Sequence, residues 1–162
     1  MMPSHSRQPT FVLHPCTPMN VQVFLPSERL RPFVSTFMII ESKDGMLNTI
    51  LPDIHMTMAF CFKGKVLYKE NNGLQASPPA AITGLRKAAR LLQYEKGTAT
   101  LLVKFTEAGA MAFLPAPPSA LFNHTVALEQ VIPHHKAVAL CEQLAEAEHH
   151  LQPIALVEST LI

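Results

Sequence analysis

Basic and aromatic residues gather near one predicted strand of the sequence. Arg86 and Lys87 lie just before the strand predicted over residues 89–95, which carries Arg90 and Tyr94. Because alternate residues of a strand share a face, Arg90 and Tyr94 point to the same side. An Arg and a Tyr beside an apolar wall suit a small anionic or amphipathic molecule, since binding pockets are mostly apolar with a few convergent polar groups. The alternative is that this face meets water, where the charges keep an edge strand from aggregating.

A second strand supplies a candidate wall for such a pocket. Apolar residues at alternate positions, among them Met58 and Phe60, share one face of the strand predicted over residues 55–62. If the strands close into a barrel, one face of each strand points to a common interior. We therefore predict a ligand site formed by Met58, Phe60, Arg90 and Tyr94. The sequence leaves open which faces point inward, and the Met and Phe stripe could equally be core.

Patterns that could bind a metal are sparse. The usual signature on a strand is a His-x-His pair, and the nearest match is Asp53 with His55. Because no second histidine lies on that strand, we interpret His55 as a half-buried structural residue. Residues 142–150 also hold acids and histidines, of which Glu146 and His150 stand four apart on a predicted helix. We interpret them as a polar face in water, and we predict no metal and no cofactor.

Nucleophilic catalysis has no visible set of residues. Cys16, Cys61 and Cys141 lie in Pro-rich, apolar-strand and amphipathic-helix contexts, none of which lowers the pKa of a thiol. No Gly-rich loop has the spacing that cradles phosphate, and no Ser lies in a nucleophile elbow. We therefore predict that the chain has no catalytic residues and is not an enzyme.

The elements that position these residues are short, evenly spaced strands. Turn residues separate them, as at Lys63-Gly64, where a hairpin between the flanking strands is plausible. About eight such strands are typical of an antiparallel barrel or sandwich, and not of alternating strands and helices. They are predicted on either side of the Asp44-Gly45 turn and over residues 21–25, 33–40, 55–62, 65–70, 80–85, 89–95 and 98–105.

Helical periodicity begins after the last of these strands. From Pro133 onward, apolar residues that include Leu140, Leu144 and Leu151 fall on one stripe of an amphipathic helix. Pro153 restarts the chain, and a second apolar stripe runs to Ile162. The first stripe is wide enough to need a partner, so we predict that Leu140, Leu144 and Leu151 bury against the β body or a second subunit.

Composition narrows the class of protein. The 162 residues are enough for one domain with a sizeable core. A net charge of +1 does not indicate a nucleic-acid-binding surface. The three cysteines are an odd number without CxxC or CxxxC spacing, which argues against a disulfide framework. No apolar run reaches signal-peptide or membrane-spanning length, so we expect a cytoplasmic protein with no membrane contact.

Several short motifs, in this order, resemble the N-terminal sensing domain of AraC-type transcription regulators. The sharpest lies at residues 105–110, where a strand ends in Phe and a Thr-Glu-Ala-Gly-Ala turn follows. A Pro-rich break and Leu-Phe-Asn at residues 121–123 come next. Leu-Arg-Pro-Phe-Val at residues 30–34 and Leu-Pro-Asp at residues 51–53 extend the likeness toward the N-terminus.

The resemblance implies an α+β fold, with a cupin-like antiparallel β-barrel followed by a C-terminal helical pair. As one regulatory domain, the chain would comprise a disordered tail (1–10), a barrel body (11–105), a junction with short helices (106–132) and a helical tail (133–162). Its role would be to sense a small-molecule effector and to form a homodimer. DNA would be bound only through helix-turn-helix motifs expected beyond Ile162. Two alternatives stay open: a cupin-like metal-dependent enzyme acting on a small metabolite, and a ligand-free interaction module.

Overall fold

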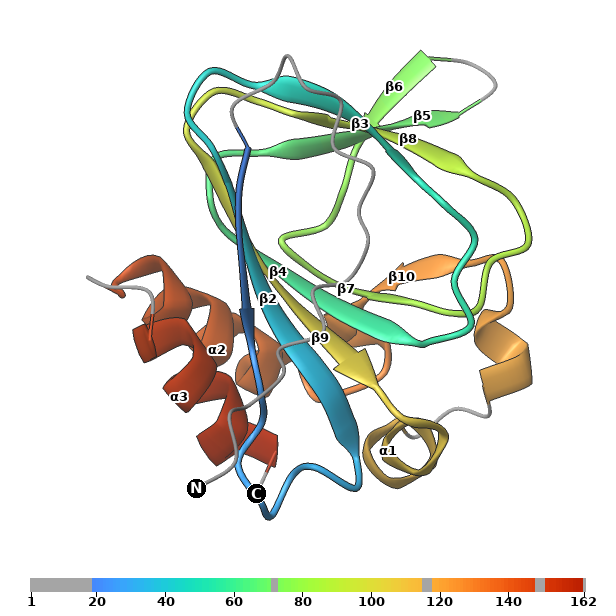
Figure 1. The fold of residues 1–162 in the computed structure, drawn as a ribbon, viewed down its shortest axis with the longest axis vertical. Coiled ribbons are helices and arrows are strands. Elements are labelled where there is room, and N and C mark those ends of the chain that lie inside the picture. Colours follow the sequence, from blue (N-terminus) through green and yellow to red (C-terminus); the bar gives the residue numbers. More distant parts are fainter. Residues whose placement is uncertain (1–18, 71–72, 115–117, 148–150, 162) are drawn as a thin grey trace, which may run out of the picture.

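Two antiparallel sheets form the β part of the molecule, and helices cover the outer face of the larger one (Figure 1). The computed structural model describes residues 19–70, 73–114, 118–147 and 151–161. The large sheet has the strand order β1 (Met19–Phe24), β2 (Val34–Ser42), β9 (Thr98–Phe105), β4 (Thr57–Lys63), β7 (Ala80–Thr83) and β10 (Thr125–Ala127). The small sheet has the order β3 (Met46–Ile50), β8 (Arg90–Tyr94), β5 (Val66–Glu70) and β6 (Gly73–Ala76).

Three tight turns carry the chain from one sheet to the other at a common end. Gly45 lies between β2 and β3, Gly64 between β4 and β5, and Gly97 between β8 and β9. Their φ angles of 79°, 70° and 75° belong to a region that glycine adopts readily and other residues rarely. The turns also bond to one another, since the Gly97 amide donates to the Ser42 carbonyl at 2.9 Å. The two sheets are therefore tied together at this end.

Apolar side chains fill the space that these turns close. Ile40 of the large sheet packs with Val66 and Tyr94 of the small sheet, and all three side chains are almost fully buried. A packed cluster of this kind keeps water out and fixes the distance between the sheets. The sheets touch here, and the space between them begins at this cluster and extends toward the opposite end of the strands.

The main hydrophobic core lies on the other face of the large sheet. Alternate residues of its central strands point to this side, and Phe60 and Leu101 are at most 1% exposed. Helices α2 (His134–Ala145) and α3 (Leu151–Leu161) cover this face, and α1 (Glu107–Phe113) follows β9 at its end (Figure 1). Within the described segments, no helix is long and apolar enough to cross a membrane.

The start of α1 is tied to the chain just before β2. The Thr106 side chain caps the helix by accepting from the Gly109 amide at 3.0 Å, and its hydroxyl donates to the Pro32 carbonyl at 2.7 Å. A Cβ at Gly109 would collide with the Phe33 carbonyl oxygen. Glycine is therefore required here because two backbones approach closely, and the motif at residues 105–110 marks a structural junction.

The strand predictions hold for much of the β part, with three corrections. The strand predicted over residues 98–105 is β9, and that over 65–70 is β5. The expected hairpin of β4 with β5 is wrong, because the Gly64 turn passes the chain to the small sheet, where β5 pairs with β6 and β8. Strands β6 and β10 were not predicted. Among the described residues no strand pairing joins the two sheets, so the structure shows facing antiparallel sheets without a closed barrel.

The C-terminal helical pair is present, and its apolar stripe packs within the chain. Leu140 and Leu144 of α2 are 6% and 1% exposed and belong to the core shared with the large sheet. Of the two partners predicted for this stripe, the β body is therefore the one that these two residues contact. The backbone of Leu151 begins α3, while its side chain lies outside the described part of the structure.

Truncation of the α2 stripe tests this packing. We expect Leu144→Ala to lower the free energy of unfolding by about 2–5 kcal/mol, because it leaves a cavity in a closely packed core. Val138→Ala is the matched control, since Val138 lies on the outer side of the same helix with 37% of its surface exposed. Val138→Ala should change the free energy of unfolding by less than about 0.5 kcal/mol. Urea denaturation followed by circular dichroism measures both, and equal stability of the two variants would contradict the packing.

Candidate functional site

A cavity of about 690 Å³ lies between the two sheets. Its walls are the inner face of the large sheet, the inner face of the small sheet, and the segments 51–53 and 84–86 that connect them. Cavities of roughly 300–1,000 Å³ are the size that holds small organic ligands in proteins. This space is the candidate functional site of the chain.

The strand register places a row of polar side chains across the large sheet at one end of the cavity. Thr57 of β4 is paired with Lys104 of β9 on one side and with Thr83 of β7 on the other. Thr83 is in turn paired with Thr125 of β10, and their hydroxyl oxygens lie 3.0 Å apart. Directly paired residues of an antiparallel sheet share a face, so all four line the cavity. This row, Lys104, Thr57, Thr83 and Thr125, is called the polar row below.

The next rows of the same face are mostly apolar. Two residues along each strand, Leu102 of β9 is paired with Ala59 of β4, which is paired with Ala81 of β7. All three line the cavity, and the small sheet faces them with Leu92 and Tyr94. The cavity therefore has an apolar body that ends in the closed cluster of Ile40, Val66 and Tyr94, and a polar end at the opposite side.

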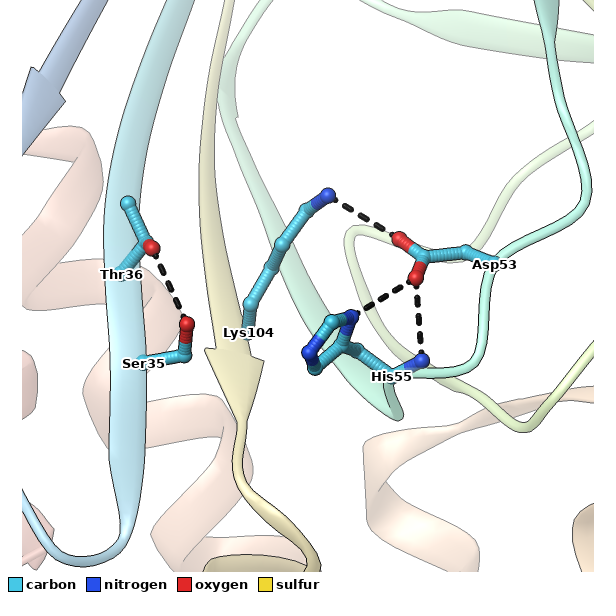
Figure 2. Close-up of polar contacts among 5 residues, drawn as sticks. All are labelled: Ser35, Thr36, Asp53, His55 and Lys104. Carbon is cyan, nitrogen blue, oxygen red and sulfur yellow. Dashed lines mark hydrogen bonds and ion pairs between the residues drawn. The ribbon is translucent and has the colours of Figure 1, made fainter. Parts of the chain in front are cut away.

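An acid, a base and a histidine meet at the polar end (Figure 2). Lys104 extends from β9 so that its Nζ lies 3.0 Å from Oδ2 of Asp53, and the other carboxylate oxygen lies 2.8 Å from Nδ1 of His55. The His55 amide also donates to this second oxygen at 3.0 Å. Burial alone would raise the pKa of Asp53, but the hydrogen bonds from Lys104 and His55 outweigh it and hold the pKa below its usual 3.8. Asp53 is therefore a carboxylate at neutral pH.

Two arginines complete the polar end from the small sheet and the connecting segment. Arg90 of β8 donates to the Thr125 hydroxyl at 2.8 Å, and its guanidinium carbon lies 4.3 Å from the centre of the Tyr68 ring. Arg86 donates to the Asn123 carbonyl at 3.2 Å, and its amide donates to the Asp53 carbonyl at 3.3 Å. Both arginines line the cavity and also a second hollow of about 400 Å³ beside it.

The structure separates the four predicted ligand residues into two places. Arg90 and Tyr94 line the cavity, and burial raises the pKa of Tyr94 to about 12, so its phenol is neutral. Met58 and Phe60 lie on the opposite face of β4 and are packed in the core beneath the helices. The expectation that they face Arg90 is therefore wrong, because the helices cover the face with the larger apolar side chains. The smaller Thr57, Ala59 and Cys61 line the cavity instead.

The remaining candidates from the sequence are the cysteines and the possible metal ligands. Burial raises the pKa of the Cys61 and Cys141 thiols, which disfavours the reactive thiolate. Cys16 and His150 lie outside the described residues. Among those that are described, no group of three or more His, Cys, Asp or Glu is placed to hold a metal ion.

Sequence reasoning missed the role of Asp53, Lys104 and the polar row. Lys104 did carry a signal, because it is a charged residue in a strand whose neighbours are almost all apolar. In a strand with neighbours on both sides, such a residue needs a polar space or a partner on its own face. The threonines carried no comparable signal, since threonine is common in strands that face water.

Fold and site together define a protein with two facing antiparallel sheets and an internal cavity of ligand size. Residues 22–127 match the family model described as Domain of unknown function (DUF6597), and the chain belongs to this family. No curated protein matches the sequence.

Similar solved structures share only part of the arrangement. The plu4264 protein from Photorhabdus luminescens is 11% identical, with a TM-score of 0.44 over 59% of this chain and 81% of that one. The cupin_2 domain of an XRE family transcriptional regulator from Enterobacter cloacae is 13% identical, with a TM-score of 0.39 over 55% of this chain and 98% of that one. The AraC-like transcriptional activator CuxR is 11% identical, with a TM-score of 0.42 over 87% of this chain and 58% of that one. Likeness at this level says nothing of function.

Acid titration tests the contacts of Asp53. A carboxylate whose pKa is lowered by folding contributes stability above its unfolded pKa, about 3.9, and this contribution is lost as the pH falls through the lower folded pKa. We therefore expect Asp53→Asn to remove part of the fall in stability below about pH 4. Urea denaturation between pH 2 and 7 measures the free energy of unfolding of each variant. Asp44→Asn, at an exposed residue of the turn before β3, is the control. An unchanged pH dependence in Asp53→Asn would contradict the assignment.

Proposed function

We propose that this chain is the effector-sensing domain of a DNA-binding transcription regulator of the AraC type, and that the cavity between its sheets holds the effector. The cavity is the observation that carries the proposal. It combines a ligand-sized volume with an apolar body and a few polar groups gathered at one end. A domain filled by its own side chains, as in a pure interaction module, would have no such space.

The motifs that resemble AraC-type sensing domains support the same reading from another direction. Residues 51–53 form part of the cavity wall, and Asp53 supplies its carboxylate. Residues 30–34 and 105–110 meet where Thr106 bonds to Pro32, at the start of β2 and the end of β9. These motifs thus fall on the cavity wall and on the junction between the sheet and α1. The regulatory role and the binding of DNA through a further domain rest on this resemblance.

The helical tail is the part of the fold that would carry a signal from the cavity. The Ser27 amide, just after β1, donates to the carboxylate of Glu158 in α3 at 2.8 Å. Helix α2 packs on the outer face of β4, whose inner face lines the cavity. A ligand that shifts β4 would therefore shift the helices on its other side, because close-packed elements transmit displacement. We expect homodimer formation through surfaces of this tail, and not through Leu140 and Leu144, which the chain itself buries.

A cavity-filling variant tests ligand binding without knowledge of the ligand. Ala59→Leu adds three carbon atoms inside the cavity, whereas Ala139→Leu adds them on the exposed side of α2. After incubation with a small-molecule extract of bacterial cells, native mass spectrometry should show an added mass on the wild type and on Ala139→Leu. The added mass should be absent or weaker on Ala59→Leu. Equal retention by all three proteins, or no retention by any, would contradict the sensing function.

The regulatory part of the proposal needs a measurement in cells. Immunoprecipitation of the full gene product should recover DNA, and transcripts of the recovered genes should change in the Ala59→Leu strain but not in the Ala139→Leu strain. If no DNA is recovered, the transcription-regulator reading is wrong, while binding in the cavity is still judged by mass spectrometry.

A further inference from the structure

We infer that the cavity selects an organic anion with an apolar body, of the kind formed by a carboxylate on a hydrocarbon group, and that this anion takes the place of the Asp53 side chain beside Lys104. The inference rests on the proposed sensing function and names the chemical class of its ligand. It depends on three observations: the balance of charge at the cavity wall, the separation of polar and apolar rows, and the different ways in which Asp53 and Lys104 are held.

The charge balance of the cavity wall favours an anion. Among the described residues that line it, Arg86, Arg90 and Lys104 are cations at neutral pH, and Asp53 is the one carboxylate. Among these described lining residues, the Arg and Lys side chains therefore outnumber the carboxylates by three to one. A concave site of low dielectric focuses such a field, so an anion that enters is attracted more strongly than it would be on an open surface.

The cations are not spread around the cavity but gathered at one end. Lys104 belongs to the polar row, and Arg90 donates to Thr125 at the far side of the same row. From Lys104 to Thr100, near the closed cluster, β9 advances by four residues, roughly 13 Å. The wall between them carries Leu102, Ala59 and Leu92. A ligand that fills this space needs a charged group at one end and an apolar body of comparable length.

Asp53 already provides an anionic group at this place, and it is the more easily moved partner of Lys104. Lys104 stands on β9, a central strand bonded to both β2 and β4. Asp53 stands on the segment that links β3 to β4, where one isolated bridge to Arg86 holds its backbone. Its neighbours Leu51 and Ile54 are 65% and 82% exposed. A ligand carboxylate can thus take over the contact with Lys104 while the Asp53 carboxylate moves away from Lys104 and keeps its hydrogen bond from the His55 amide.

Three small probes separate the contribution of charge from that of the apolar body. Octanoate has both, octanol has the body alone and acetate has the charge alone. Isothermal titration of the purified wild-type chain should show that octanoate binds at least about tenfold more tightly than octanol or acetate. If octanol binds as well as octanoate, the cavity takes apolar ligands without regard to charge, and the inference is overturned while the sensing function stands.

Two substitutions of opposite effect locate the anionic group. Lys104→Gln should weaken octanoate binding about tenfold or more, because it removes the cation. Asp53→Asn should strengthen it, because it removes the competing carboxylate, a gain that mere structural damage would not produce. Lys63→Gln, on the exposed end of β4, is the matched control and should leave the affinity unchanged. Should Asp53→Asn fail to fold, Lys104→Gln against Lys63→Gln still decides the question.

Failure of this inference can be told apart from failure of the proposed function. Equal octanoate affinity of Lys104→Gln and Lys63→Gln would mean that the anion does not bind beside Lys104. Weaker binding by Asp53→Asn than by the wild type would refute the replacement of the Asp53 side chain by the ligand carboxylate. If none of the three probes binds, the inferred ligand class is wrong. The comparison of Ala59→Leu with Ala139→Leu then decides on the sensing function, because it assumes nothing about the charge of the ligand.

Discussion

The pairing of β9 with both β2 and β4 is the constraint on which the rest of this structure depends. Residues on the three strands fall into register, so the side chains of each row point to the same side of the sheet. On one side the row Phe37, Val103, Met58 is apolar and nearly free of solvent contact. On the other side the adjacent row runs from Thr36 through Lys104 to Thr57. A shift of β9 by one residue would turn Lys104 under the helices, and a shift of β4 by one residue would turn Met58 toward the cavity.

The helices decide which of these faces becomes core. Burying a large apolar side chain is worth about 1.5–3 kcal/mol, so the face with Phe60, Met58 and Leu101 attracts the apolar stripes of α2 and α3. The opposite face, with Thr57, Ala59 and Thr100, has less apolar surface to bury. This face can therefore line a cavity that the small sheet covers on the other side. The glycine turns and the cluster around Tyr94 hold the sheets together at one end, which leaves the cavity its polar end at the other.

The sequence was a good guide to the elements and a poor guide to their faces. Periodicity marked β9 and α2 because each has one strongly apolar stripe, and turn residues such as Gly45 marked the strand ends. Alternation cannot say which of two half-apolar faces meets the helices, and the Met58 prediction was wrong for that reason. Strand β10 was missed because three residues are too few for a periodic signal. The partnership of Asp53 with Lys104 joins residues 51 positions apart, which no local pattern can reveal.

Arg90 shows how groups of the cavity wall stabilise a cation. A buried guanidinium is costly unless its charge and its donors are matched. Here Thr125 accepts one hydrogen bond, and the face of the Tyr68 ring lies against the charge. These two contacts stabilise the cation through a hydroxyl oxygen and an aromatic face. Lys104, in contrast, faces the carboxylate of Asp53. The polar end thus holds a lysine beside an internal acid and an arginine beside a hydroxyl and an aromatic ring. This gathering of polar groups at one end of an apolar space is what distinguishes the cavity from an ordinary packing defect.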